Sequence, residues 1–408
     1  MTSESVYANN RKIHVFIVGS KGIPARYGGF ETFVEELTKG KVNPDIQYHV
    51  SCMANDEHHF VHNGADCFNV RVPLPGAPGR ILHVGLVLEE VEKWIERNRD
   101  EQVIVYILGC RIGPLLIPHA KRLRKLGAKL ICNPDGLEWK RQKWNAAEKI
   151  FLKYCEKCLV ENSDLSICDS RSIEQYIRAT YGSKVKNTTF IAYGANSEEP
   201  NTTEEQFEAW IKSFKIRKGE YYLIVGRFVP DNNYETMISE FVKSSTKKDL
   251  VIITNIEKNS FYKELAKKTG FESDPRIKFV GTVYDQDLLK TIRRNAFAYL
   301  HGHEVGGTNP SLLEALAFTP VNLVLNVGFN REVGQDAALY WTKESGSLSA
   351  LISQVEELAS KEFADQMHQK AAQRIADVYN WKSIIQQYEA VFAFAYMDIP
   401  SQEESMAF

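Results

Sequence analysis

Residues 296–316 read AFAYLHGHEVGGTNPSLLEAL, and this stretch contains the pattern that decides the fold. The apolar run at 296–300 predicts a short buried strand. Glycines then form a turn, and Pro310 suits the start of a helix because proline fits the first helical position. A strand, a glycine-rich turn and a helix in immediate succession predict one unit of a parallel sheet covered by helices.

The same unit recurs along both halves of the 408-residue chain. Continuous apolar runs alternate with longer amphipathic stretches, which predicts an α/β protein with Rossmann-like, doubly wound sheets. Besides 296–300, the expected strands cover residues 14–18, 47–52, 103–107, 129–132, 164–168, 189–192, 221–225, 250–254, 277–280 and 322–325.

A polar segment, residues 196–205 with Pro200 inside it, interrupts the repeat and predicts a linker. We therefore expect an N-terminal domain over residues 1–197 and a C-terminal domain over 198–378. The amphipathic stretch 381–396 predicts a final helix within 379–408 that packs back on the N-terminal domain. Two such domains facing a central cleft bind ligands at the carboxyl ends of their strands.

Composition excludes several other classes of protein. Hydrophobic residues make up 44% of the chain and charged residues 25%, which is typical of a globular protein, and the net charge of −2 gives no indication of nucleic-acid binding. Seven scattered cysteines favour reduced thiols in a cytoplasmic protein, and Cys155-x-x-Cys158 is interpreted as helix packing because no second metal-binding pair accompanies it. We expect no secretory signal and no membrane-spanning segment.

Charged and polar residues follow two strands of the C-terminal half. Arg227 comes just after the strand at 221–225, and its planar guanidinium suits a diphosphate. The turn Gly306-Gly307-Thr308-Asn309 leaves bare backbone N–H groups at the start of a helix, where an anion is favoured. Glu314 lies about one helical turn further on, in reach of a bound sugar. His301 and His303 flank Glu304, but two histidines at i, i+2 on a loop are weak evidence for a metal site.

Two glycine-containing loops follow strands of the N-terminal half. Residues 19–31 read GSKGIPARYGGFE, with Lys21 and Arg26 beside the glycines. The glycines let the backbone approach a ligand, and the spacing is neither that of a Rossmann G-x-G-x-x-G nor that of a Walker A loop. A plain tight turn is the alternative.

The second loop, residues 133–144, reads NPDGLEWKRQKW. Asp135 and Glu138 are candidates to hold a sugar hydroxyl or accept its proton, and Lys140 and Arg141 are candidates to meet a phosphate. Its tryptophans suit stacking on a sugar or a place at the lipid headgroup boundary. The alternative is a helix N-cap at Asp135 followed by a solvated charged face.

The residues quoted so far resemble a known family. Arg227 after a strand, and a glycine-rich turn leading into PSLLEAL (310–316), resemble the donor site of retaining glycosyltransferases of family 4, which have the GT-B fold. More narrowly, GSKGIPARYGGFETFVEEL (19–37) and DGLEWKRQKW (135–144) resemble bacterial rhamnosyltransferases that build capsule or cell-wall polysaccharides. The resemblance extends from about residue 13 to residue 396.

This resemblance implies the substrates and the roles of the site residues. The donor is dTDP-β-L-rhamnose, and the acceptor is undecaprenyl diphosphate bearing glucose or N-acetylglucosamine, joined by a β-1,4 bond. No metal or other cofactor is expected, because positive side chains and helix dipoles stabilise the leaving diphosphate. We assign catalytic roles to Asp135 and Glu304, donor binding to Arg227, Asn232, Val283, Gly306, Gly307, Thr308, Asn309 and Glu314, and acceptor binding to Gly28, Gly29, Glu31, Glu138, Trp139, Lys140 and Arg141.

The sequence departs from the family pattern at two positions. Asn232 stands where family 4 usually has a lysine, five residues after Arg227, so the phosphate site has one cation fewer. Gly306 stands where the family has a glutamate, eight residues before Glu314, and Glu304 is the nearest carboxylate that takes its place.

A lipid-linked acceptor implies a cytoplasmic enzyme held peripherally on the inner face of the cell membrane. The apolar residues 115–117 lie beside a basic segment that attracts anionic headgroups, with a solvated helix face as the alternative. That segment contains Lys121, Arg122, Arg124, Lys125 and Lys129. The competing functions are a family 4 transferase with a UDP-sugar donor or another acceptor, and a GT-B-like sugar-nucleotide sensor or epimerase.

Overall fold

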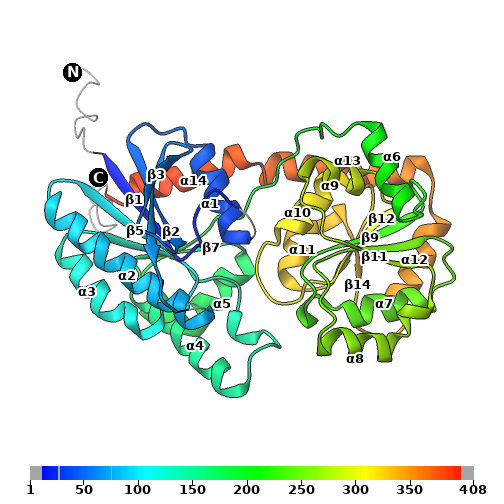
Figure 1. Cartoon of the computed structure of the whole chain (residues 1–408), viewed down its shortest axis with the longest axis horizontal. Coiled ribbons are helices and arrows are strands. Elements are labelled where there is room, and N and C mark those ends of the chain that lie inside the picture. Colours follow the sequence, from blue (N-terminus) through cyan, green and yellow to red (C-terminus); the bar gives the residue numbers. More distant parts are fainter. Residues whose placement is uncertain (1–11, 26–27, 75, 397–408) are drawn as a thin grey trace, which may run out of the picture.

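The computed structural model describes residues 12–25, 28–74 and 76–396, and these form two α/β domains side by side (Figure 1). The N-terminal domain contains an eight-stranded sheet of order β3-β4-β2-β1-β5-β6-β7-β8, in which only the β3–β4 pair is antiparallel. Its strands are β1 (Ile13–Val18), β2 (Ile46–Ala54), β3 (His59–His62), β4 (Ala65–Arg71), β5 (Gln102–Leu108), β6 (Lys129–Asn133), β7 (Leu165–Cys168) and β8 (Thr188–Phe190).

Helices cover both faces of this sheet, because its central strands are mostly apolar and are buried on both sides. β5 shows this directly, since its last six residues are all buried. The helices are α1 (Gly29–Lys39), α2 (Gly76–Arg97), α3 (Leu116–Lys125), α4 (Ala146–Glu161) and α5 (Arg171–Tyr181), with short 3₁₀ turns η1 (Gly113–Leu115), η2 (Glu138–Lys140) and η3 (Gly182–Lys184).

The C-terminal domain repeats the design with a parallel six-stranded sheet of order β11-β10-β9-β12-β13-β14. Its strands are β9 (Tyr221–Val225), β10 (Asp249–Ile253), β11 (Ile277–Gly281), β12 (Ala298–His301), β13 (Asn322–Leu325) and β14 (Leu339–Trp341). Its helices are α6 (Glu204–Ser213), α7 (Tyr234–Lys243), α8 (Ser260–Thr269), α9 (Gln286–Arg294), α10 (Pro310–Phe318), α11 (Gly328–Gly334), α12 (Ser347–Glu357) and α13 (Lys361–Val378), with the 3₁₀ turns η4 (Pro230–Asn232), η5 (Phe271–Ser273) and η6 (Gln335–Ala337). The prediction of two Rossmann-like domains is confirmed.

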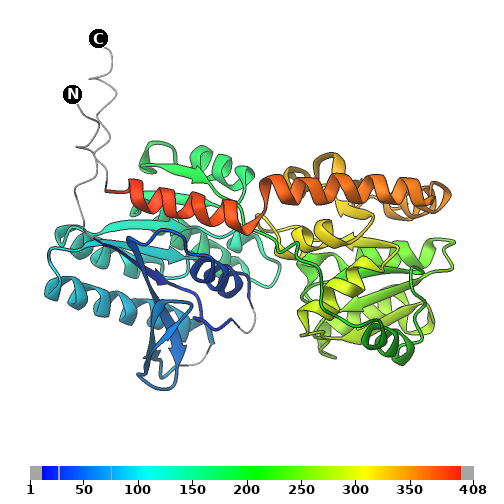
Figure 2. The same cartoon turned by 90° about the horizontal axis from the view of Figure 1, so that it is seen from above.

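The last helix, α14 (Trp381–Phe394), leaves the C-terminal domain and packs on the N-terminal one. Figure 2 shows α13 over one domain and α14 over the other, along the same side of the molecule. The rings of Tyr388 and Phe392 pack against Tyr106 on β5, with centroids 6.0 and 5.7 Å away. The chain therefore crosses between the domains twice, once in the segment before α6 and once between α13 and α14.

Most expected strands lie within a few residues of the observed ones, but the β3–β4 hairpin and β14 were not foreseen. In β3, exposed residues alternate with half-buried ones, so the strand lacks the continuous apolar run used to find the others. No helix in the described ranges is long and apolar enough to cross a membrane. All seven cysteines lie in those ranges as buried free thiols.

Candidate active site

The candidate site lies where loops after the carboxyl ends of both sheets meet. A Cβ atom added to Gly136, in the loop after β6, would lie 2.4 Å from Cα of Gly306, in the loop after β12. The backbone N–H of Gln142 donates to Oδ1 of Asp231 across the same boundary, at 2.9 Å. We call this region the domain junction. It brings the 133–144 loop and the 301–309 loop into direct contact, although residues 136 and 306 are far apart in sequence.

The turn before α10 lies at the N-terminal end of that helix. Gly306 has φ of +153°, in the region that favours glycine. Oδ1 of Asn309 caps α10 by accepting the Ser311 N–H at 2.9 Å, and Pro310 occupies the first turn. The backbone of residues 306–308 therefore approaches the positive end of the helix dipole, where the sequence analysis expects the donor diphosphate.

Asn232 occupies the position of the missing lysine and is held from two sides. Its Nδ2 donates to the carbonyl of Arg227 at 2.8 Å, and its Oδ1 lies 2.9 Å from Nδ1 of His303. Burial, then the nearby His301 and Arg141, hold the pKa of His303 well below its usual range. The neutral ring therefore donates from Nδ1 to Asn232, and its Nε2 faces Gly306, where a Cβ would lie 2.7 Å away. Because Asn232 replaces the expected lysine, the exposed guanidinium of Arg227 is the cation that the loop after β9 presents.

The two candidate site glutamates of the C-terminal domain, Glu304 and Glu314, each have a cationic partner. Lys343 contacts both carboxylate oxygens of Glu304, at 2.8 and 3.0 Å, and Asn233 donates to Oε2 at 3.1 Å. Glu314 pairs with the buried Arg293 at 2.5 Å. The Glu314 carboxylate is therefore held by a buried cation.

Val283 follows β11, where the base was expected. It packs against the apolar cluster of the C-terminal domain, beside the exposed Tyr284.

Asp135 lies at the domain junction on a constrained backbone. Its φ of +63° is in the left-handed region, and Oδ1 of Asn133 accepts its backbone N–H at 2.9 Å. Its own Oδ1 accepts the N–H of Gly136 at 2.7 Å. Asp135 is not a helix N-cap: Leu137 holds that position before η2, and Asn145, which forms a capping box with Glu148, caps α4.

Asp169, which the sequence analysis missed, is buried beside Asp135. It follows β7 directly, and its Oδ1 has no hydrogen-bond partner in the described structure. A Cβ on Gly307 would lie 1.8 Å from that oxygen, and the hydroxyl of Thr308 donates to the Asp169 carbonyl. Burial, and then the charge of Asp135, raise the pKa of Asp169 to about 8. Its position directly after a strand, the signal that identified Arg227, could have revealed it.

Glu138 is the buried centre of a cluster of cations. Its carboxylate accepts from Arg111 at 2.9 Å and Arg141 at 2.5 Å, and it pairs with Lys143 at 3.0 Å. Burial alone would raise its pKa, but the charges of Arg141, Lys143 and Arg111 outweigh burial and lower the pKa to about 2. Glu138 therefore holds positive groups in place at the junction and is permanently ionised near neutral pH.

The tryptophans and the exposed Lys140 surround this cluster. Trp144 donates to Glu138 Oε1 at 3.2 Å, and Trp139 donates to the hydroxyl of Tyr176 at 3.1 Å. The ammonium of Lys140 lies 5.5 Å from the Trp139 ring centroid. Both indole N–H groups are thus occupied within the domain.

The 19–31 loop is folded onto its own helix. Oε1 of Glu31 accepts the N–H of Lys21 at 2.8 Å, and Gly28 has φ of +133° with Glu31 Oε2 directly beside it. Gly29 begins α1, and space beside it is open. Arg26 lies outside the described residues. Glu31 therefore fixes the loop that carries the glycines of the first motif.

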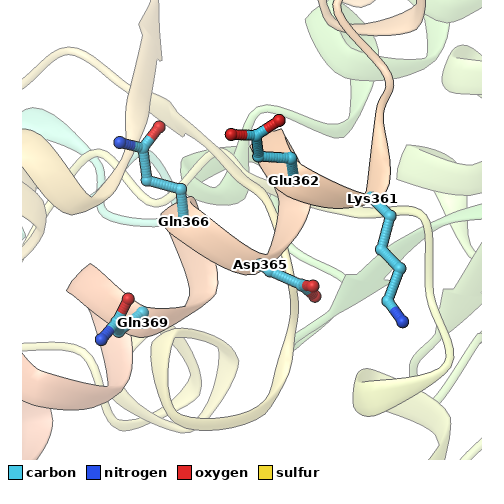
Figure 3. A pocket seen from close by; sticks show the side chains of 5 residues that line it. All are labelled: Lys361, Glu362, Asp365, Gln366 and Gln369. Atoms are coloured by element: carbon cyan, nitrogen blue, oxygen red, sulfur yellow. The ribbon is translucent and has the colours of Figure 1, made fainter.

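Other features of the described part of the chain lie apart from the junction. No group of three or more His, Cys, Asp or Glu side chains there is arranged to hold a metal ion. Figure 3 shows a pocket along α13, lined by side chains that spread from a single helix: Lys361, Glu362, Asp365, Gln366 and Gln369. It contains none of the candidate site residues.

Comparisons with known proteins agree with this architecture. Residues 12–196 match a domain of unknown function, DUF1972, and residues 206–374 match glycosyl transferases group 1. A search of curated proteins finds no match.

Several solved structures have the same fold. Sucrose-phosphate synthase from Thermosynechococcus elongatus has a TM-score of 0.75 and 16% identity, covering 95% of this chain and 99% of that one. A glycosyltransferase from Rickettsia africae has a TM-score of 0.70 and 13% identity, covering 96% and 100%. Anabaena HepE in complex with UDP and glucose has a TM-score of 0.67 and 13% identity, covering 94% and 99%. The GT-B prediction is confirmed.

Proposed function

We propose that this chain, which is a glycosyltransferase of the GT-B fold, moves L-rhamnose from dTDP-β-L-rhamnose to a lipid-linked acceptor. The acceptor is undecaprenyl diphosphate bearing glucose or N-acetylglucosamine, and the bond is β-1,4 with the donor's configuration retained. The reaction belongs to capsule or cell-wall polysaccharide synthesis, on the cytoplasmic face of the cell membrane. Support for rhamnose comes from the resemblance of residues 19–37 and 135–144 to rhamnosyltransferases.

The observation that best supports a transfer reaction at the domain junction is the close approach of Gly136 to Gly306. It places Asp135 beside the 306–309 turn and within the same junction as Arg227. In this proposal the donor diphosphate binds the turn and the Arg227 guanidinium, while Glu314 binds the ribose and Val283 flanks the base. These fixed positive groups stabilise the leaving diphosphate, so no metal is required.

Asp135 then orients the acceptor hydroxyl that attacks the anomeric carbon. The bond from that carbon to the diphosphate breaks, a bond to the acceptor oxygen forms on the same face, and the hydroxyl proton passes to the leaving diphosphate oxygen. The charges around Glu138, with Lys140 at their edge, supply positive potential for the acceptor diphosphate. Glu304, fixed by Lys343, orients the transferred sugar, and the 28–31 segment forms the opposite wall.

A UDP-sugar donor is the second candidate, because HepE, a protein of the same fold, was solved with UDP. Thermal-shift titration separates the two. We expect dTDP-rhamnose to raise the melting temperature more than UDP-glucose does at equal concentration. Greater protection by the UDP-sugar would contradict the rhamnosyl assignment.

Replacing Arg227 tests the diphosphate site. R227A should weaken donor binding at least about tenfold, since a charge-assisted bidentate contact contributes about 1.5–3 kcal/mol. R217A is the matched control, because Arg217 is an exposed arginine of the same domain whose side chain has no partner among the residues that the structure describes. Unchanged donor affinity in R227A would remove Arg227 from the site.

A further inference from the structure

Large apolar side chains are exposed on one side of the N-terminal domain. On α4, Ile150 is 73% exposed, Phe151 48% and Tyr154 47%, and Leu115 at the end of η1 is 50% exposed. Ile150 and Tyr154 are four residues apart, and Phe151 is adjacent, so all three lie on one helical face. We call these four residues the α4 patch. Contiguous exposed apolar groups of this kind mark an interaction surface.

Leu115 belongs to this patch because η1 packs against α4. A Cβ atom on Gly113 would lie 2.5 Å from Sγ of Cys155, one residue after Tyr154. Leu115 at the end of η1 and the exposed face of α4 are thus neighbours on the same side of the domain.

Positive charge lies beside the α4 patch. Lys157, which is half-buried, is three residues after Tyr154 and lies on the same side of α4. On α3, Arg124 donates to the carbonyl of Asn162 at the end of α4 at 2.5 Å, so the α3 face carrying residues 117, 121 and 124 is turned toward α4. Lys121 lies on that face, is exposed, and has no side-chain partner in the described structure.

Three of the other cations of the basic segment are engaged within the domain or with an aromatic ring, whereas the exposed Lys125 has no side-chain partner in the described structure. Arg122 pairs with Glu92 at 2.6 Å, Arg124 also pairs with Asp164, and Lys129 lies over the ring of Tyr396. The basic segment alone therefore presents less free charge than its sequence suggests. The apolar side chains of α4 add a hydrophobic contact to the surface.

The patch is directly connected to the candidate site. Asn145, the N-cap of α4, follows immediately after the 133–144 loop, and η2 of that loop packs against α4. Figure 1 shows α3 and α4 as neighbouring helices of the N-terminal domain. A partner bound at the start of α4 would be held close to the junction where Asp135 lies.

We propose that the α4 patch docks on a bilayer containing anionic lipids, with the apolar side chains at the acyl boundary and Lys121 and Lys157 at the headgroups. The choice of a bilayer rests on the proposed lipid-linked acceptor and on the combination of apolar and positive groups. Docking at α4 would present the acceptor diphosphate to the neighbouring 133–144 loop while its lipid tail stays in the membrane.

Vesicle sedimentation tests this surface. The probes are vesicles of equal parts phosphatidylcholine and phosphatidylglycerol, and vesicles of phosphatidylcholine alone. We expect I150S/F151S to bind the anionic vesicles at least about tenfold more weakly than the unmodified chain. V61S is the matched control, because Val61 is a 70% exposed apolar residue on β3. K121S should weaken binding to the anionic vesicles only.

Three results would overturn the proposal. The first is an unmodified chain that binds neither vesicle, and the second is I150S/F151S binding as tightly as V61S. The third is sedimentation velocity showing a dimer that only the patch variant dissociates, because the patch would then be covered by a second copy. L115S, on a different element, repeats the test independently, and an unchanged melting temperature verifies that each variant folds.

A water-soluble acceptor with a short lipid separates docking from catalysis. With this acceptor, I150S/F151S should transfer the sugar at the rate of the unmodified chain. A loss of turnover as large as the loss of vesicle binding would contradict a role in docking alone. A chain that binds anionic vesicles through the patch but uses no rhamnosyl donor would support the surface and contradict the proposed substrate.

Discussion

The carboxyl group of Asp169 lies between the two domains, and its surroundings control its charge. Its pKa is raised to about 8 by burial and by Asp135, whereas an aspartate in an unfolded chain titrates near pH 4. Between these values the unfolded chain has released the proton that the folded chain keeps. The free energy of unfolding therefore falls as pH rises through this window.

Asparagine has the same shape at position 169 but cannot ionise. D169N should therefore gain stability over the unmodified chain by about 1.4 kcal/mol per pH unit between pH 5 and pH 7. Melting temperatures at pH 5, 6 and 7 measure this difference. D365N, at an exposed site on α13, should show no such trend, and a pH-independent effect of D169N would contradict the assignment.

At the scale of single elements, the turn before α10 depends on the absence of a side chain. A Cβ on Gly307 would lie 1.8 Å from Asp169 Oδ1, so G307A must displace either the turn or the buried carboxyl. We expect G307A to lower both the melting temperature and the affinity for the donor, the latter at least about tenfold, because a small displacement at a positioning element has a large effect.

G85A is the control for this substitution. Space beside Gly85, inside α2, is open, so alanine there should stabilise the helix by up to about 1 kcal/mol. In a D169A background the stability cost of G307A should shrink, since the clashing carboxyl is gone. An equal stability cost of G307A in the unmodified and D169A backgrounds would show that the clash with the Asp169 carboxyl does not cause the destabilisation.

The elements of this fold could largely be predicted because buried parallel strands are continuous apolar runs, as in β5. The edge strands β3 and β14 were missed, because β3 mixes histidines with apolar residues and β14 is only three residues long. Arg227, Asp135 and the 306–309 turn were found because polar residues directly after strands gather at one sheet edge. The ion cluster at Glu138 and the contact of Asp169 with Gly307 depend on how distant loops meet, which local sequence does not encode.

At the scale of the whole molecule, α14 ties the end of the chain to the first domain. Phe392 is fully buried there, whereas Phe394 on the same helix is 57% exposed. F392A should cost about 3–5 kcal/mol, and F394A should change stability by less than about 1 kcal/mol. Thermal unfolding of the two variants compares them directly, and similar melting temperatures would contradict the packing of α14 as a part of the N-terminal core.

The central claim is that both domains together transfer rhamnose to a lipid diphosphate sugar, and one assay tests it. Purified protein is mixed with dTDP-rhamnose and synthetic lipid diphosphate bearing glucose or N-acetylglucosamine, in the presence of EDTA, and products are identified by mass spectrometry. The account predicts one added deoxyhexose on one of the two acceptors, with EDTA having no effect. No product from dTDP-rhamnose, together with turnover of a UDP-sugar, would contradict it.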